Sequence, residues 1–297
     1  MRREVRWTNL SLKEMSRRLA EMGTPASKRV LRPLLKTLGF VKRKAHKTLA
    51  MGDHPDRDAQ FPNIAKLKQE FLDAGLPVLS IDTKKKEFLG TFYRDGQLYS
   101  RDEVRVDDHD FPSFAEGKVI PYGIYDLAAN KAHVTIGTSH DTSEFACECL
   151  TLWWEQHGRE RYPTATKLLL LCDGGGSNAS NRHVFKEELQ RLADRLGIEI
   201  RVAHYPPYCS KYNSIEHRVF PHVTRACQGV VFESVDLVSD LISRTQTQTG
   251  LTVTTSILDR VFELGRKVSD NFLETCRILR DNVLPKWNYR ALPTPTS

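Results

Sequence analysis

The sequence lacks the features of a membrane or exported protein. None of its apolar runs approaches the eighteen or so residues that a membrane-spanning helix needs, and no signal-peptide core follows the basic start. Its six cysteines include no Cys-x-x-Cys pair and no zinc-knuckle spacing, so neither a structural zinc site nor a disulfide framework is predicted. We therefore expect a cytoplasmic protein with free thiols and no membrane partner.

Acidic residues are scarce in the first fifty positions. Residues 1–50 contain 14 Lys or Arg and three acids, a net charge of +11, whereas the rest of the chain carries 30 basic and 34 acidic side chains. A basic arm on a nearly neutral body is typical of nucleic-acid-binding proteins, and a merely solvated basic face is the simpler alternative. A nucleic acid is therefore the expected partner.

Two short helices are predicted within this basic region. Ser11 and Glu14 form a capping box, and apolar residues then recur at helical spacing as far as Met22. Ser27 can begin a second helix, which Gly39 can end. Two helices around a tight turn are typical of a helix-turn-helix. The nucleic-acid contacts are expected from basic residues in and after the second helix: Lys28, Arg29, Arg32, Lys36, Lys42, Arg43 and Lys44.

Two features weaken this prediction. Pro33 lies inside the second helix, where it removes a hydrogen bond and costs about 3 kcal/mol unless the helix kinks. Two helices of this length also cannot bury a core by themselves, so we expect residues 1–50 to form an incomplete helix-turn-helix. A linker and a lead-in helix are predicted to follow over residues 51–75, with the helix beginning at about Pro62.

The rest of the chain is long enough for one sizeable α/β domain. Its pattern predicts strands first and then alternating helices and strands. The expected strands cover 77–85, 87–94 (a hairpin with the first), 120–126, 133–138, 167–173 and 198–204, and the expected helices cover 142–157, 183–196 and a segment from about 213. This order predicts a ribonuclease H-like mixed sheet flanked by helices over residues 76–230, followed by a helical extension over 231–297.

Three acidic residues lie where a predicted element meets a loop. Asp82 ends the first strand, Asp173 follows the apolar run of a strand covered on both faces, and Glu216 lies in the helix after the last strand. An acid at a strand end is common, so each residue alone indicates little. Together they can converge on hard divalent cations, which prefer oxygen ligands. That arrangement is typical of metal-dependent enzymes that cut phosphodiesters.

Other residues near these acids are weaker candidates. Lys84 and Lys211 can contact a nucleic-acid backbone, and a charged strand edge is an equally good interpretation of Lys84. Asn178 can orient a scissile phosphate. His204 can reach a metal centre, although a hydrogen-bonded structural histidine is the more common case. His217, beside Glu216, can touch phosphate.

Several longer motifs resemble the Rhodopirellula-type DDE transposases of bacterial insertion sequences. The likeness covers most of the chain, from the first helix to about Tyr289. The residues that carry it are Asp-Thr-Lys-Lys-Lys-Glu at 82–87, Ile-Pro-Tyr-Gly-Ile-Tyr-Asp at 120–126, Asp-Gly-Gly-Gly-Ser-Asn at 173–178, Tyr-Pro-Pro at 205–207, Ser-Lys-Tyr-Asn-Ser-Ile-Glu-His at 210–217, His-Pro-Asp-Arg-Asp-Ala-Gln-Phe at 54–61 and Trp-Asn-Tyr at 287–289.

The resemblance implies a ribonuclease H-like core in which Asp82, Asp173 and Glu216 bind Mg²⁺ or Mn²⁺, with two ions expected. It implies hydrolysis of DNA at the element's ends, attack of the freed 3′-hydroxyl on target DNA, and a homodimeric complex. Two alternatives stay open, a decayed relative that only binds DNA and a ribonuclease H-like nuclease. Pro221 departs from the pattern and should kink or end the helix of Glu216 near Phe220.

Overall fold

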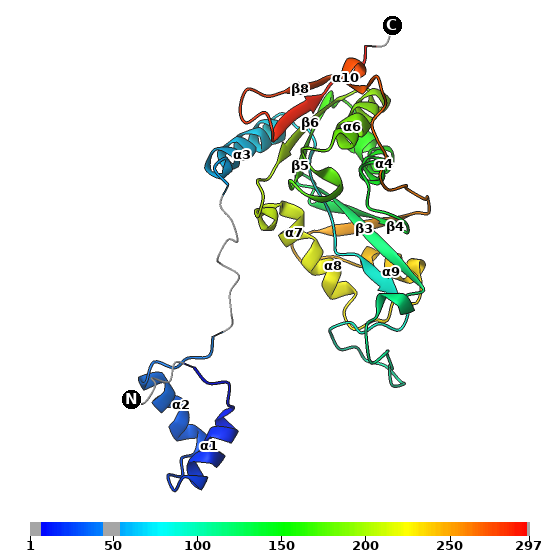
Figure 1. The fold of residues 1–297 in the computed structure, drawn as a ribbon. Coiled ribbons are helices and arrows are strands. Elements are labelled where there is room, and N and C mark those ends of the chain that lie inside the picture. The colour runs from blue at the N-terminus through cyan, green and yellow to red at the C-terminus, as the bar shows by residue number, and fades with distance from the viewer. Residues whose placement is uncertain (1–6, 44–53, 296–297) are drawn as a thin grey trace. The chain divides into compact units, whose positions relative to one another are not determined.

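The computed structural model describes residues 7–43 and 54–295. The chain divides into two units, residues 1–50 and 51–297, which are described separately below (Figure 1). Lys44, one of the expected nucleic-acid contacts, lies outside the described residues. No helix within the described ranges has the length and apolar character that crossing a membrane requires.

The first unit contains two helices, α1 (Leu12–Glu21) and α2 (Lys28–Thr37). The Ser11 hydroxyl accepts a hydrogen bond from the Glu14 amide at 3.1 Å, as a helix cap does. Pro33 lies inside α2 without ending it. Val30 and Leu34 of α2 are exposed, Leu35 is half-buried, and Leu31 is its one buried residue. The two helices are present as predicted, and their assignment as a helix-turn-helix stays a prediction.

The second unit is built on a nine-stranded mixed sheet. Seven of its strands are β1 (Val78–Thr83), β3 (Gly117–Asp126), β4 (Lys131–Gly137), β5 (Lys167–Cys172), β6 (Glu199–His204), β7 (Thr252–Leu258) and β9 (Asn288–Ala291). The order across the sheet is β7-β4-β3-β1-β5-β6-β9, with β8 (Ile278–Arg280) beyond β9 and β2 (Glu87–Leu89) paired with β3. β1, β5 and β6 are parallel neighbours, and they lie within three of the segments predicted as strands.

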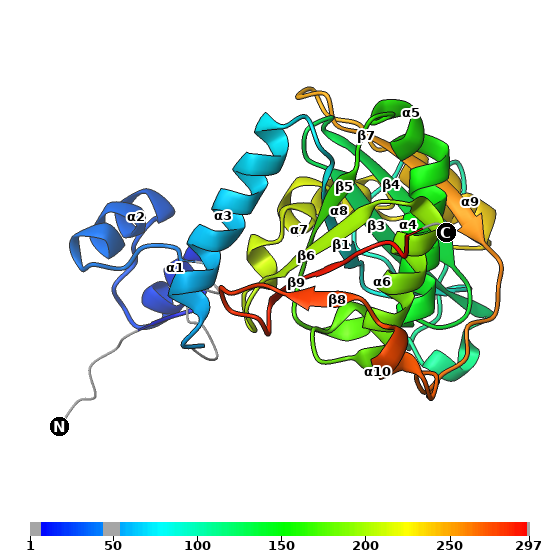
Figure 2. The ribbon, with the colours of Figure 1, turned by 90° about the horizontal axis from the view of Figure 1, so that it is seen from above.

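Helices cover both faces of this sheet (Figure 2). One face packs against α4 (Ser143–Trp153) and α6 (His183–Leu196) around the buried Trp153 and Phe185. A π-helical turn (Trp154–Gly158) and α5 (Arg159–Arg161) extend α4. The opposite face packs against the helices α3 (Arg57–Asp73), α7 (Ser214–Arg218), α8 (Phe220–Ala226) and α9 (Val235–Ser243). The observed layers are those of the predicted fold class, a mixed sheet flanked by helices.

Several predicted elements differ from the observed ones. Helix α3 begins at Arg57, five residues before the expected start at Pro62. The expected hairpin between residues 77–85 and 87–94 is wrong, because both edges of β1 are occupied by β3 and β5, so that β2 pairs with β3 instead. The break expected near Phe220 is confirmed, since α7 ends at Arg218 and Pro221 lies in the first turn of α8.

The C-terminal segment also differs from the expected helical extension. It contains α9 and a short helix α10 (Phe272–Thr275), but it also supplies β7, β8 and β9 to the main sheet. β7 pairs in parallel with β4, and β9 pairs antiparallel with β6. The segment 252–258 is rich in β-branched residues, which favour strands, yet its pairing partner lies more than a hundred residues away in the sequence.

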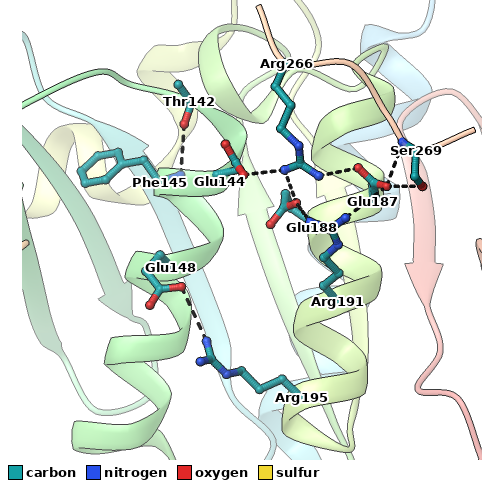
Figure 3. A network of polar contacts seen from close by, with 10 residues as sticks. All are labelled: Thr142, Glu144, Phe145, Glu148, Glu187, Glu188, Arg191, Arg195, Arg266 and Ser269. Carbon is teal, nitrogen blue, oxygen red and sulfur yellow. Dashed lines mark hydrogen bonds and ion pairs between the residues drawn. The ribbon is translucent and has the colours of Figure 1, made fainter. Parts of the chain in front are cut away.

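A charged network ties the loop before α10 to the two helices on one face (Figure 3). The Arg266 guanidinium contacts Glu144 of α4 at 2.7 Å and Glu187 and Glu188 of α6 at 2.6 and 2.5 Å. The Ser269 hydroxyl donates a further hydrogen bond to Glu187 at 2.6 Å. Because Glu187 and Glu188 are largely buried, their charges need this compensation. The loop is thereby joined to both α4 and α6.

Candidate active site

Two of the three predicted carboxylates lie at one edge of the sheet. Asp82 is the penultimate residue of β1, and Asp173 directly follows Cys172, the last residue of β5. Because β1 and β5 are parallel neighbours, their carboxyl ends meet at the same edge. In open α/β sheets this edge is where functional sites are found.

Helix α7 brings the third carboxylate to the same place through a buried polar anchor. The Ser80 hydroxyl accepts a hydrogen bond from the Ile215 amide at 2.9 Å and donates one to the Asn213 side chain. The Asn213 amide in turn donates to the Ile81 carbonyl at 3.0 Å. Both anchoring side chains are fully buried. This anchor attaches the start of α7 to β1, so that Glu216 lies next to Asp82.

Burial and the neighbouring carboxylates together raise the pKa of Asp82 to about 8. The largest cause is burial, followed by the negative charges of Asp173 and Glu216, and a 2.8 Å hydrogen bond from the Thr83 amide only partly opposes them. The pKa of Asp173 is also raised, first by burial and then by the charges of Glu216 and Asp141, against a backbone hydrogen bond from Gly175. The cluster therefore holds a proton unless a cation replaces it.

A fourth carboxylate, Asp141, belongs to the same surroundings and was not predicted. It lies just before α4, accepts a hydrogen bond from the Thr83 hydroxyl at 3.2 Å and raises the pKa of Asp173. Its signal in the sequence is an acid between a strand end and a helix cap at Thr142. That is the same kind of position that singled out Asp82 and Asp173.

The donor set fits a hard divalent cation. Among residues 7–43 and 54–295, no three His, Cys, Asp or Glu side chains are arranged closely enough to form a ready-made metal site. The available donors are nevertheless carboxylate oxygens, which Mg²⁺ and Mn²⁺ prefer. Their mutual repulsion, visible in the raised pKa of Asp82, is what a bound cation offsets. Asp82, Asp173 and Glu216 would hold such an ion.

This electrostatic arrangement predicts how stability depends on pH when no metal is bound. The folded protein keeps the Asp82 proton up to about pH 8, whereas the unfolded chain loses it near the ordinary pKa of 3.8. The unfolded state therefore binds fewer protons between these values, and the free energy of unfolding should fall as the pH rises from about 4 towards 8. Urea denaturation in EDTA across this range measures the slope.

The matched variant for this experiment is Asp82→Asn, which has no carboxyl proton to lose. It should flatten the decline with pH, and Mg²⁺ should restore stability to the wild type at alkaline pH. A wild-type stability that stays constant or increases between about pH 4 and 8 would contradict the assigned electrostatics.

Two of the auxiliary candidates, Asn178 and His204, are buried and make hydrogen bonds within the protein. Asn178 is buried, and its side-chain oxygen accepts a hydrogen bond from the Tyr122 hydroxyl at 3.3 Å. His204 is fully buried and its ring nitrogens contact the Asp173 carbonyl and the Tyr289 hydroxyl. Burial lowers the pKa of His204 to about 4, so the ring is neutral.

The predicted basic contacts are mostly exposed. Lys211 and His217 are exposed on either side of Glu216, whereas Lys84 is half-buried and paired with Glu87 at 3.0 Å. In the first unit, all of the described candidates are exposed: Lys28, Arg29, Arg32, Lys36, Lys42 and Arg43.

A mixed sheet with helices on both faces and carboxylates at the ends of adjacent central strands defines a ribonuclease H-like enzyme. The chain belongs to the Rhodopirellula transposase DDE domain family, whose profile matches residues 1–293. It is therefore a DDE transposase, a class of enzyme that uses divalent metal ions. No curated protein sequence matches it significantly.

Solved structures with a similar fold include two complexes of the Mos1 transposase. A pre-cleavage Mos1 transpososome has a TM-score of 0.50 and 11% sequence identity, covering 81% of this chain and 72% of that one. The Mos1 paired-end complex with the left transposon end gives 0.49 and 11% over the same shares. At this identity the comparison concerns the fold alone.

Proposed function

We propose that this transposase cuts DNA at the ends of its insertion sequence and joins the freed 3′-hydroxyl to target DNA. The observation that carries the proposal is the meeting of Asp82, Asp173 and Glu216 at one sheet edge, with a pKa for Asp82 of about 8. These side chains would hold Mg²⁺ or Mn²⁺, and two ions fit the family's chemistry. The bound metal would activate the attacking oxygen and stabilise the leaving oxygen.

The chain's own residues position the reacting groups. Asp82 and Asp173 stand on central strands, whose neighbours on both sides keep their backbone in place. Glu216 stands on α7, which the Ser80 and Asn213 anchor attaches to β1. Lys211 and His217 are exposed beside it and are proposed to contact the phosphates that flank the scissile bond. Such rigid placement holds the reacting groups in the geometry that the reaction requires.

DNA is the proposed partner of the basic first unit. Its exposed basic side chains offer sequence-independent contacts to phosphate, and α2 is proposed as the DNA-reading helix. The Mos1 structure of similar fold with a TM-score of 0.50 is a pre-cleavage transpososome. A homodimer in the cytoplasm is the proposed assembly, with residues 1–50 as the DNA-binding region and residues 51–75 joining it to the catalytic domain. Since β7 to β9 belong to the main sheet, this domain is proposed to continue beyond residue 230.

The preserved carboxylate cluster favours an active enzyme over a decayed copy that only binds DNA. A general nuclease is the second alternative, and the basic first unit argues against it, since a nuclease without sequence preference has little need of a DNA-reading module. A decayed copy would cut no DNA, and a general nuclease would cut DNA without sequence preference, whereas a transposase cuts at the ends of its element.

The test is cleavage of a labelled duplex that contains the element's end, in Mg²⁺ and in EDTA. We expect cuts at the junction between element and flank in Mg²⁺, and none in EDTA, because the carboxylates alone cannot activate the attacking oxygen. A random duplex of equal length is the control. Equal cutting of both duplexes would favour the nuclease, and binding without any cutting would favour the decayed relative.

A further inference from the structure

We propose that Tyr289 and Trp287, at the far end of the chain, are positioning residues for Asp173. They act with His204 to hold the turn on which this carboxylate stands. The proposal rests on the proposed function, because it concerns the same carboxylate cluster. It assigns a role to the Trp-Asn-Tyr motif at 287–289, which the sequence singled out without an interpretation.

The first part of the argument is a buried relay through His204. Its Nδ1 lies 3.0 Å from the carbonyl oxygen of Asp173, and its Nε2 lies 2.9 Å from the Tyr289 hydroxyl. A carbonyl only accepts, so the neutral ring carries its proton on Nδ1 and accepts from Tyr289 through Nε2. The Asp173 carbonyl therefore fixes the tautomer, and the hydrogen bond from Tyr289 to Nε2 holds the ring in the orientation that reaches Asp173, as outer partners of metal ligands do in other proteins.

Trp287 supports the same turn by direct packing. A Cβ added at Gly174 would lie only 3.2 Å from Cζ3 of the Trp287 ring. Any larger residue at this position would therefore require the ring or the turn to move slightly. The Trp287 carbonyl also accepts a hydrogen bond from the His204 amide at 3.0 Å. Its indole N–H donates to Asp56 at 2.7 Å. The Trp287 ring is thus fixed by Asp56 on one side and packs against Gly174 on the other.

The side-chain amides of Gln60 and Asn288 form a buried pair next to His204. Gln60 and Asn288 exchange hydrogen bonds of 2.9 and 2.7 Å, and Gln60 also donates to the His204 carbonyl at 2.9 Å. All three side chains are fully buried. Residues 56–60 lie near the start of the second unit. The network therefore connects the entry of the chain into this unit with the turn of Asp173.

The test variant is Tyr289→Phe, which removes the hydroxyl and keeps the ring. We expect the Mg²⁺ concentration that gives half of the maximal thermal stabilisation to rise about 10-fold or more, as loss of such outer partners does. The same shift is expected in the Mg²⁺ dependence of cleavage, with partial recovery at high Mg²⁺. The thermal measurement needs no turnover, so it reports the cation site separately from activity.

The matched control is Tyr162→Phe. Tyr162 donates to Asp126 at 2.9 Å, and Asp126 pairs with Leu79 near the start of β1, at the end of the strand away from Asp82. This variant should lose stability without a change in Mg²⁺ dependence. If Tyr289→Phe behaved like it, losing stability alone, the positioning role would be overturned.

Two further outcomes also decide the question. If Tyr289→Phe did not fold, Trp287→Phe, which loses the bond to Asp56, should show the same weakened Mg²⁺ response, and an unchanged response would overturn the proposal. If the wild type showed neither Mg²⁺ stabilisation nor cleavage, the proposed function would fall and this role with it. If the wild type responded to Mg²⁺ and Tyr289→Phe showed the same Mg²⁺ dependence, only the positioning role would be rejected.

Discussion

Asp173→Asn should reduce divalent-dependent strand cleavage at least about 1000-fold while DNA affinity stays the same. The change keeps the shape of the side chain but removes a carboxylate whose pKa is already raised by burial and by neighbouring acids. A metal ion contributes several kcal/mol to such reactions, and about 4 kcal/mol corresponds to 1000-fold. Single-turnover cleavage and a gel-shift titration on the same duplex measure the two effects.

Asp73→Asn serves as the control for this variant, because Asp73 is exposed at the end of α3 and carries the same chemical change. It should cleave like the wild type. Retention of more than about a tenth of the activity in Asp173→Asn would remove this residue from the catalytic set. A parallel loss of DNA affinity would point to misfolding instead.

Gly123→Val should abolish most cleavage by displacing Glu216 without touching any carboxylate. Gly123 is the register partner of Asp82, and a Cβ there would lie 2.6 Å from Cδ1 of Ile215 and 2.8 Å from Cε1 of Phe220. Because both side chains are buried and have little room to give way, we expect valine to push α7 and α8 away from the sheet. We expect a loss of about 100-fold in cleavage and of about 1–3 kcal/mol in the free energy of unfolding.

Gly117→Val, in the same strand, provides the comparison. A Cβ at Gly117 would meet only the flexible end of Leu89, at 3.3 Å, and Leu89 lies in β2 rather than in a catalytic element. This variant should keep nearly full activity. Equal activity of the two valine variants would mean that the distance between α7 and the sheet does not limit catalysis.

The parts of the fold that the sequence predicted are those with a strong local signal. β5 is a continuous apolar run that ends at Asp173, and α6 is an amphipathic segment that ends at Gly197 in a left-handed conformation. Strand β7 is rich in β-branched residues, but neither β7 nor β9 has a local pairing signal, because the partners of both strands lie far away in the sequence. The hairpin error has the same cause, since only the whole sheet shows that β1 has no free edge.

The candidate site was predictable to a similar degree. Asp82, Asp173 and Glu216 were chosen because each stands at the junction of an element and a loop, and the structure brings them together. The side chains that hold them had no such signal. Ser80 is one polar residue between the apolar Leu79 and Ile81, and its bond with Asn213 spans 133 positions, a pairing that no local pattern contains.

The late position of β9 in the sequence has a consequence for synthesis on the ribosome. β6 is complete at His204, but its edge partner ends only at Ala291. At typical elongation rates this leaves the edge of β6 unpaired for roughly 4 to 17 s. An open strand edge can pair with another chain during that time. The nascent transposase therefore passes through an aggregation-prone interval, and slow translation after residue 204 should lower the yield of folded enzyme.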